Sequence, residues 1–387
     1  MLGEAATELR RALPLTWEAG WQPAELVRQA RRTGARVGRL LASAVLADHA
    51  HRHAATLHPR WAEQVDELAC ADRAAGAAAG LDAWLAAFTD REGLTGEELA
   101  SAVVDGLAVC LGVRALPVII PPPGSGTAPS GGADRSRSHA ANDDPVLAKV
   151  RALLAQAEST TYEAEAATFT EKAQELMARH AIELALVWEQ AGRDERPVTV
   201  RLAIDDPYIG AKSLLLQVVA IHSRCRSVFH ELYALSSVVG FASDVSTTEV
   251  LFTSLLVQSQ VAMRSEGRTA GPGSRVRSRS FRSSFLFAYV GRIDERLAAV
   301  NASVEAEADA TQGSSLLPVL VARSDAVDDR VEELFGPLRG THVRTVTDPV
   351  GWARGRMAAD RAELSFGDLD VNVDVEHQGG RKGLGAA

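Results

Sequence analysis

The first hundred residues carry hydrophobic side chains at three- and four-residue spacings. Residues 4–111 are rich in Ala, with Leu, Val and Trp at helical intervals and hardly any alternating runs, a pattern typical of amphipathic helices. Helix-start signals agree with it, because Pro23 suits a first helical turn and Thr95 stands three residues before Glu98, as in a capping box. We therefore predict an all-helical bundle over residues 1–118.

The chain then loses its hydrophobic residues. Residues 121–142 are mainly Pro, Gly, Ser and charged residues, with Arg135, Arg137 and His139 near the end. Such a segment buries too little surface to offset the entropy lost on ordering. We predict a flexible linker over residues 119–143, which separates the bundle from the rest of the chain.

Helical periodicity resumes after this linker. Leu and Val residues fall on one face of a helix over residues 146–158. A second capping box at residues 160–163 begins a long helix that we expect to end near His180. The two helices together predict a helical hairpin over residues 144–190.

Beyond residue 190 the sequence changes between strand-like and helix-like periods. We predict an α+β part over residues 191–366, in which helices pack on a small sheet, and a tail over residues 367–387. Strands are expected at residues 198–204, 227–233, 236–241 and 316–321. Helices are expected at residues 211–222, 244–256, 281–300, 326–335 and 350–362. The predicted fold class is therefore α+β, with an N-terminal all-α bundle and a hairpin that leads into a small sheet.

The hairpin resembles a known family. It is similar to the bacterial and phage family called domain of unknown function 2786 in three segments, LAKVRALLAQAE (147–158), EAEAA (163–167) and KAQELMARH (172–180). The later part of the chain resembles the companion domain that often follows that hairpin. The similar segments are VGFASDV (239–245), SSFLFAY (283–289) and ARGRMAADRAEL (353–364). The resemblance implies a fold and no catalytic residue. Its phage association suggests nucleic-acid handling, which is an association rather than a mechanism.

Composition limits the function. The 387 residues carry a formal net charge of −9, which argues against a protein that coats nucleic acid through its overall charge, so any phosphate binding must be local. Cys70, Cys110 and Cys225 are far apart and predict neither a disulfide framework nor a thiolate zinc site, so we expect the reducing cytoplasm. No apolar stretch approaches the roughly 20 residues of a membrane-spanning helix, and we expect no membrane partner.

One segment concentrates basic charge. Between residues 264 and 282 the only acidic residue is Glu266, and the arginines are Arg264, Arg268, Arg275, Arg277, Arg279 and Arg282. The planar guanidinium suits phosphate oxygens, so this loop is a candidate nucleic-acid site, together with Lys149 and Lys172 of the hairpin. The alternative is a solvated basic loop, because only Phe281 offers a ring for base stacking.

A second candidate site consists of His222, Cys225 and His230. Their spacing could bring three zinc ligands together if a helix turned directly into a strand, with Glu231 as a nearby base. However, the second His of the helical zinc-protease motif is missing, and a cysteine packed in the core explains Cys225 without a metal.

The remaining histidines have simpler interpretations. His49, His51, His53 and His58 form the densest cluster, and His49 and His53 would share a helical face. Exposed histidines on an Ala-rich helix account for this cluster without a metal. His180 at a helix end would favour the helix dipole.

The sequence leaves open whether the protein is an enzyme. The leading hypothesis is a protein that binds DNA or RNA through the basic loop, while residues 1–118 recruit a protein partner. The alternatives are a metal-dependent hydrolase that uses His222, Cys225 and His230, and an assembly or scaffold protein.

Overall fold

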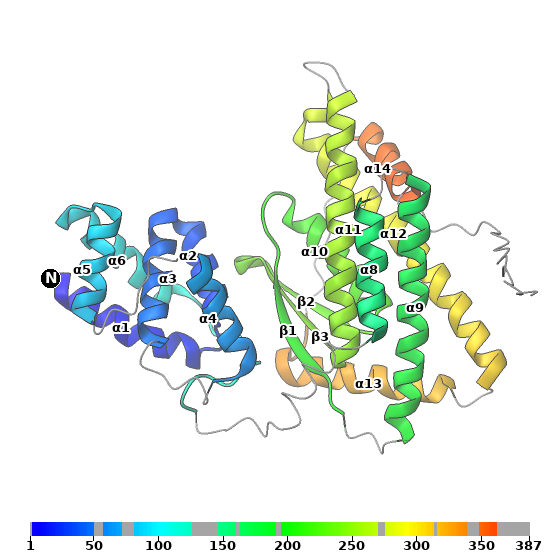
Figure 1. The fold of residues 1–387 in the computed structure, drawn as a ribbon, viewed down its shortest axis with the longest axis horizontal. Helices are drawn as coiled ribbons and strands as arrows, with labels where there is room; N and C mark the ends of the chain where they lie inside the picture. Colours follow the sequence, from blue (N-terminus) through cyan, green and yellow to red (C-terminus); the bar gives the residue numbers. More distant parts are fainter. Residues whose placement is uncertain are drawn as a thin grey trace, which may run out of the picture.

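The chain forms three blocks in space. A computed structural model describes residues 2–49, 57–71, 81–125, 145–159, 163–190, 195–269, 275–312, 316–338 and 348–361. The N-terminal helices lie on one side of a three-stranded sheet and the long helices of the C-terminal half lie on the other (Figure 1). This arrangement confirms the predicted α+β class.

The N-terminal block is a helical bundle around buried aromatic rings. Its described helices are α1 (Leu2–Glu18), α2 (Pro23–Thr33), α3 (Ala35–His49), α4 (Pro59–Ala71), α5 (Leu81–Glu92) and α6 (Gly96–Gly112). Trp17, Trp21 and Trp61 are buried at its centre, where large rings contribute most of the apolar area removed from water. The predicted capping box at α6 is confirmed, since Thr95 Oγ1 accepts the backbone N–H of Glu98.

The hairpin consists of α8 (Pro145–Ser159) and α9 (Glu163–Gln190). Val150 and Met177 are buried where it packs on the core of the C-terminal half. The expectation that α9 ends near His180 is wrong, because the helix continues to Gln190. Ile182 and Ala185 are buried and extend its apolar face, so His180 lies inside the helix and not at its end.

The sheet is antiparallel with the order β1-β3-β2. Its strands are β1 (Val198–Ala203), β2 (Arg226–His230) and β3 (Leu235–Gly240), and Val238 of the central strand pairs with Val200 on one side and Ser227 on the other. Every residue of β3 is buried, because helices cover both faces of the sheet. A strand covered on both faces shows no polar alternation.

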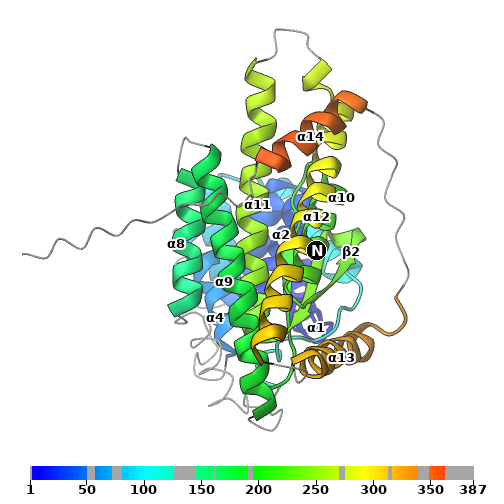
Figure 2. The same ribbon diagram turned by 90° about the vertical axis from the view of Figure 1, so that its right-hand side faces the viewer.

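The C-terminal helices form the thickest layer. They are α10 (Ile209–His222), α11 (Ala242–Thr269), α12 (Arg279–Gln312), α13 (Leu316–Phe335) and α14 (Pro349–Arg361), with a 3-10 turn η3 (Arg275–Arg277) before α12. α14 lies against α12 (Figure 2). Gly351 and Gly355 face the backbone of Phe281 and Phe285 at this contact, so the two helices approach closely. None of the described helices is long and apolar enough to cross a membrane.

The predicted strand at residues 316–321 is wrong, because these residues begin α13. A short apolar run fits a strand or a buried helix equally well. Helix spacing decides here, since Val319, Val327 and Val331 recur at multiples of four and are buried. The capping box at residues 160–163 lies partly outside the described residues. Residues 126–143 of the predicted linker and the whole predicted tail also lie outside them.

The N-terminal bundle and the sheet share one core. Tyr233, which ends the 3-10 turn η2 (Glu231–Tyr233) before β3, packs its ring edge-on against Trp21 with centroids 4.7 Å apart. Its hydroxyl accepts the backbone N–H of Arg114 at 2.6 Å. Arg28 of α2 donates to the backbone carbonyl of Tyr233 at 2.9 Å. The bundle therefore sits on the sheet through specific polar contacts as well as apolar packing.

Candidate functional site

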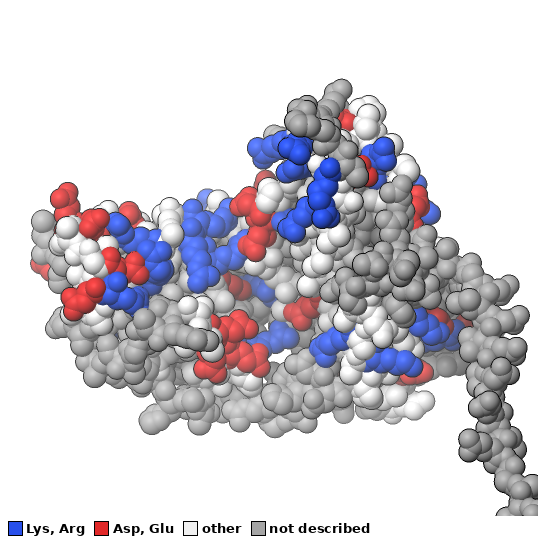
Figure 3. All heavy atoms as spheres, turned by 45° about the horizontal axis from the view of Figure 1, so that its top comes forward, with Lys and Arg blue, Asp and Glu red and all other residues white. Residues whose placement is uncertain are grey.

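A groove of about 750 Å³ opens between the C-terminal half of α11 and the start of α12. Its basic lining comes from both helices and from the turn η3, namely Arg264, Arg268, Arg277 and Arg282. Arg264 and Arg268 are one helical turn apart and share a face of α11. Figure 3 shows Lys and Arg side chains gathered at the projecting end of the molecule. The structure thus brings together arginines that the sequence placed in one loop.

Within the described ranges these arginines have no carboxylate partner. Among the described residues, none of the four forms an ion pair, and Arg264, Arg268 and Arg277 are exposed. Other arginines in the same half of the chain do form ion pairs with carboxylates. These pairs are Arg179–Glu307, Arg224–Glu305, Arg226–Asp328, Arg292–Asp360, Arg323–Asp244 and Arg356–Glu295. The groove therefore concentrates positive charge that the described part of the fold leaves uncompensated.

Glu266 pairs with an arginine of another helix. It is the one acidic residue between residues 264 and 282, and Arg354 of α14 lies 3.8 Å from its carboxylate. Its side chain is largely buried, and it does not line the groove. Glu266 thus forms an ion pair with a residue 88 positions further along the chain.

Another part of the groove lining comes from the first turn of α10 and the residues just before it. Tyr208 and Lys212 line it. Lys212 is buried, and its ammonium donates to the backbone carbonyl of Asp205 at 2.8 Å. Burial lowers the pKa of Lys212, and the charges of Asp205 and Asp206 oppose that shift. Lys212 therefore holds this segment in place and is not an open phosphate contact.

The floor of the groove is apolar. Leu256, Val261 and Met263 of α11 and Leu286 of α12 line it. Val261 is 53% exposed, so part of this apolar lining faces solvent beside the groove arginines. Apolar surface with a few convergent polar groups is typical of a ligand site.

The other predicted basic residues lie elsewhere. Lys149 is exposed on α8, and Lys172 on α9 donates to Glu175 at 2.8 Å. Neither lines the groove. Arg279 is exposed at the start of α12 beside it. The side chain of Arg275 lies outside the described residues.

The structure does not bring His222, Cys225 and His230 together as ligands. His222 Nε2 hydrogen-bonds Asp294 at 2.7 Å, whereas His230 Nε2 hydrogen-bonds Ser237 at 2.8 Å. Cys225 is fully buried, and burial raises the pKa of its thiol. Within the described ranges no group of three or more His, Cys, Asp or Glu side chains is placed to hold a metal ion.

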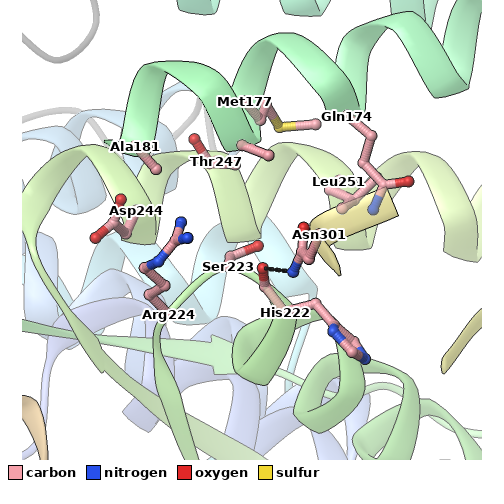
Figure 4. Close-up of a pocket in the computed structure, with 11 residues that line it drawn as sticks. Gln174, Met177, Ala181, His222, Ser223, Arg224, Asp244, Thr247, Leu251 and Asn301 are labelled. Atoms are coloured by element: carbon pink, nitrogen blue, oxygen red, sulfur yellow. Dashed lines mark hydrogen bonds between the residues drawn. The ribbon is translucent and has the colours of Figure 1, made fainter. Parts of the chain in front are cut away.

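A small cavity lies beside His222 (Figure 4). Its volume is about 20 Å³, enough for roughly one water molecule. Gln174 and Asp244 line it and are buried, and Asn301 donates its side-chain amide to the carbonyl of His222 at 2.8 Å. A cavity of this size admits no substrate, so the contacts around it serve to join α9, α10, α11 and α12.

The histidine cluster near α3 is only partly described. His49 is buried, which corrects the expectation of an exposed side chain. Its Nδ1 lies 2.9 Å from the carbonyl of Val45, and its Nε2 accepts the indole N–H of Trp61 at 2.5 Å. The cause is the packing of α4 on α3, which sequence spacing does not reveal. His51 and His53 lie outside the described residues.

Sequence reasoning missed Tyr208 and the apolar floor. Val257, Val261, Arg264 and Arg268 lie on one face of α11 at four-, three- and four-residue spacings. That periodicity was the available signal, because an apolar stripe that continues into arginines marks one amphipathic face. Nothing in the sequence shows that Tyr208 comes from another element to close the groove.

Comparison with known proteins concerns the hairpin. Residues 146–184 match the family model described as Protein of unknown function (DUF2786). The match confirms the resemblance of the hairpin and includes no residue of the groove. A search of curated proteins found no match, and a search of solved structures found none.

Proposed function

We propose that the protein binds nucleic acid through the basic groove between α11 and α12. The observation that carries this proposal is the set of four groove arginines without a carboxylate partner among the described residues. Guanidinium groups form paired hydrogen bonds with phosphate oxygens. A ligand with repeating phosphates satisfies arginines spread over two helices better than a compact anion does.

The overall charge of the protein fits local recognition. A net charge of −9 repels nucleic acid at long range, and this repulsion is screened beyond about 8 Å at physiological ionic strength. Binding must then come from the groove itself. Replacing groove arginines should consequently remove most of the affinity rather than a small share of it.

The test is a titration of a fluorescent oligonucleotide by anisotropy at several salt concentrations. DNA and RNA of mixed sequence are tested as single strands and as duplexes. If each of the four arginines meets a phosphate of a single strand, the slope of log K against log salt is about −3, at roughly −0.7 for each contact.

The decisive variant is Arg264→Ala with Arg268→Ala. We expect at least a tenfold loss of affinity and a shallower salt slope. Arg11→Ala with Arg330→Ala is the matched control, because it removes the same charge from exposed arginines that pair with glutamates on their own helices. Absence of binding at low salt, or equal losses in the two variants, would contradict the proposal.

A further inference from the structure

We infer that the groove binds a single nucleic-acid strand, with phosphates on the groove arginines and a base stacked on Tyr208. This inference rests on the proposed nucleic-acid binding and specifies its ligand. It follows from the shape of the groove, the chemistry of its floor and the way in which the fold holds Tyr208.

The shape favours a ligand that enters the protein. The groove has a volume of about 750 Å³ and is partly open to solvent. Its volume lies within the roughly 300–1,000 Å³ typical of ligand pockets. Proteins that read a duplex usually place a helix or ribbon into its major groove, about 12 Å wide. Here the arginines line a hollow instead of covering a convex ridge.

The floor favours exposed bases. Leu256, Met263 and Leu286 line the groove together with the arginines. A duplex offers phosphates, sugars and base edges, while its base faces are stacked inside. An unpaired strand offers those faces, and their burial against apolar side chains removes apolar surface from water.

Tyr208 supplies the aromatic surface in the groove lining. Its ring is half-buried against the core of the C-terminal half, so one part is held by packing while the residue still borders the groove. Every base has a π face, and stacking on an aromatic side chain therefore needs no particular sequence.

The backbone around Tyr208 is held firmly. The residue has φ 68°, the left-handed region in which a bulky side chain is unfavourable. Its carbonyl accepts the backbone N–H groups of Ala211 and Lys212 at 3.0 and 3.1 Å. The Lys212 ammonium holds the carbonyl of Asp205 at 2.8 Å. A backbone held in this way reduces the ordering needed when a strand binds, which favours binding.

The experiment compares single-stranded and duplex DNA of one sequence on the full chain at matched salt. We expect at least tenfold tighter binding of the single strand. Tyr208→Phe keeps the ring and should keep the affinity. Tyr208→Gly removes the ring but suits the left-handed backbone, so the fold is retained while single-strand affinity falls roughly five- to hundredfold.

The salt slope separates stacking from phosphate contacts. Tyr208→Gly should leave the slope unchanged, since it removes no positive charge, whereas Arg264→Ala with Arg268→Ala should reduce it. Equal affinity for both DNA forms, or unchanged binding by Tyr208→Gly, would overturn the single-strand inference while nucleic-acid binding stood. No binding to any nucleic acid would overturn both.

Discussion

The guanidinium of Arg201 on β1 donates to the carboxylate of Glu25 on α2 across 2.7 Å, inside the contact between sheet and bundle. The Arg201 side chain is 0% exposed and that of Glu25 is 9% exposed. Arg201 also donates to the carbonyls of Gly20 and Pro117. One arginine of the sheet thus satisfies three acceptors of the N-terminal bundle.

Removing one partner of this buried pair should destabilise the protein strongly. We expect Arg201→Ala or Glu25→Ala to lower the free energy of unfolding by about 3–5 kcal/mol, because the remaining charge stays buried without a partner. The double change Arg201→Met with Glu25→Met should cost less than the two single alanine changes together. Urea unfolding followed by circular dichroism measures these differences.

The exposed pair Arg330–Glu333 provides the control. Arg330→Ala should change the free energy of unfolding by less than about 1 kcal/mol. An effect of Arg201→Ala as small as that of Arg330→Ala would show that the bundle does not depend on this pair.

His230 should make stability fall with acid. Burial, aided by the nearby charge of Arg201, lowers the pKa of His230 to about 4. The unfolded chain binds a proton on His230 near its usual pKa of about 6.5, whereas the folded chain does so only near pH 4. The stability contributed by this group is therefore present above pH 6.5 and is lost as the pH falls towards 4.

The variant His230→Gln tests this assignment. Glutamine can still hydrogen-bond Ser237, as His230 does at 2.8 Å, but it does not titrate. The unfolding midpoint of His230→Gln should change less than that of the natural chain between pH 6.5 and 4. Parallel pH profiles for the two proteins would assign the acid sensitivity to other groups.

Only one of the three cysteines should react in the folded protein. Cys70 is exposed, whereas Cys110 and Cys225 are buried. Burial raises the pKa of Cys110 to about 11 and raises that of Cys225 further, so both remain as unreactive thiols at neutral pH. Alkylation followed by intact mass should add one label in buffer and three in urea.

The variant Cys70→Ser should lose the rapid label completely. Labelling of two cysteines in buffer would mean that the bundle or the core around β3 opens on the time scale of the reaction.

Glycines on α14 should be needed for its contact with α12. A methyl group on Gly355 would overlap the backbone carbonyl of Phe285. We expect Gly355→Ala to reduce stability by about 1–3 kcal/mol through overpacking. Gly291 lies within α12 with open space around it, so Gly291→Ala should stabilise by about 0.5–1 kcal/mol. Thermal unfolding distinguishes the opposite signs.

Local patterns predicted much of the fold. Helical periodicity gave the bundle and the hairpin, and the strands at residues 198–204 and 236–241 closely match β1 and β3. The prediction of a strand at residues 316–321 was wrong, because so short an apolar run has no period that distinguishes a strand from a helix. The prediction that His49 is exposed was wrong for a different reason. Its burial depends on Trp61, which lies on another helix.

The candidate site was predictable in composition but not in arrangement. The sequence gives the arginines between residues 264 and 282 and their one acidic neighbour. It does not show that Glu266 faces Arg354 or that Tyr208 closes the groove. Both facts depend on contacts between distant segments, and these are absent from the spacing of residues along one helix.

Because the bundle and the sheet share one core, the sheet depends on the N-terminal helices for part of its contacts. The hairpin matches a family model that does not extend to the sheet. The sheet contacts α2 through Arg201 and the segment after α6 through Tyr233. A protein that kept the same sheet without the N-terminal helices would leave Arg201 without its acceptors and the Tyr233 hydroxyl without its backbone donor. Such a protein must supply other partners for Arg201 and Tyr233 or carry different residues at these two positions.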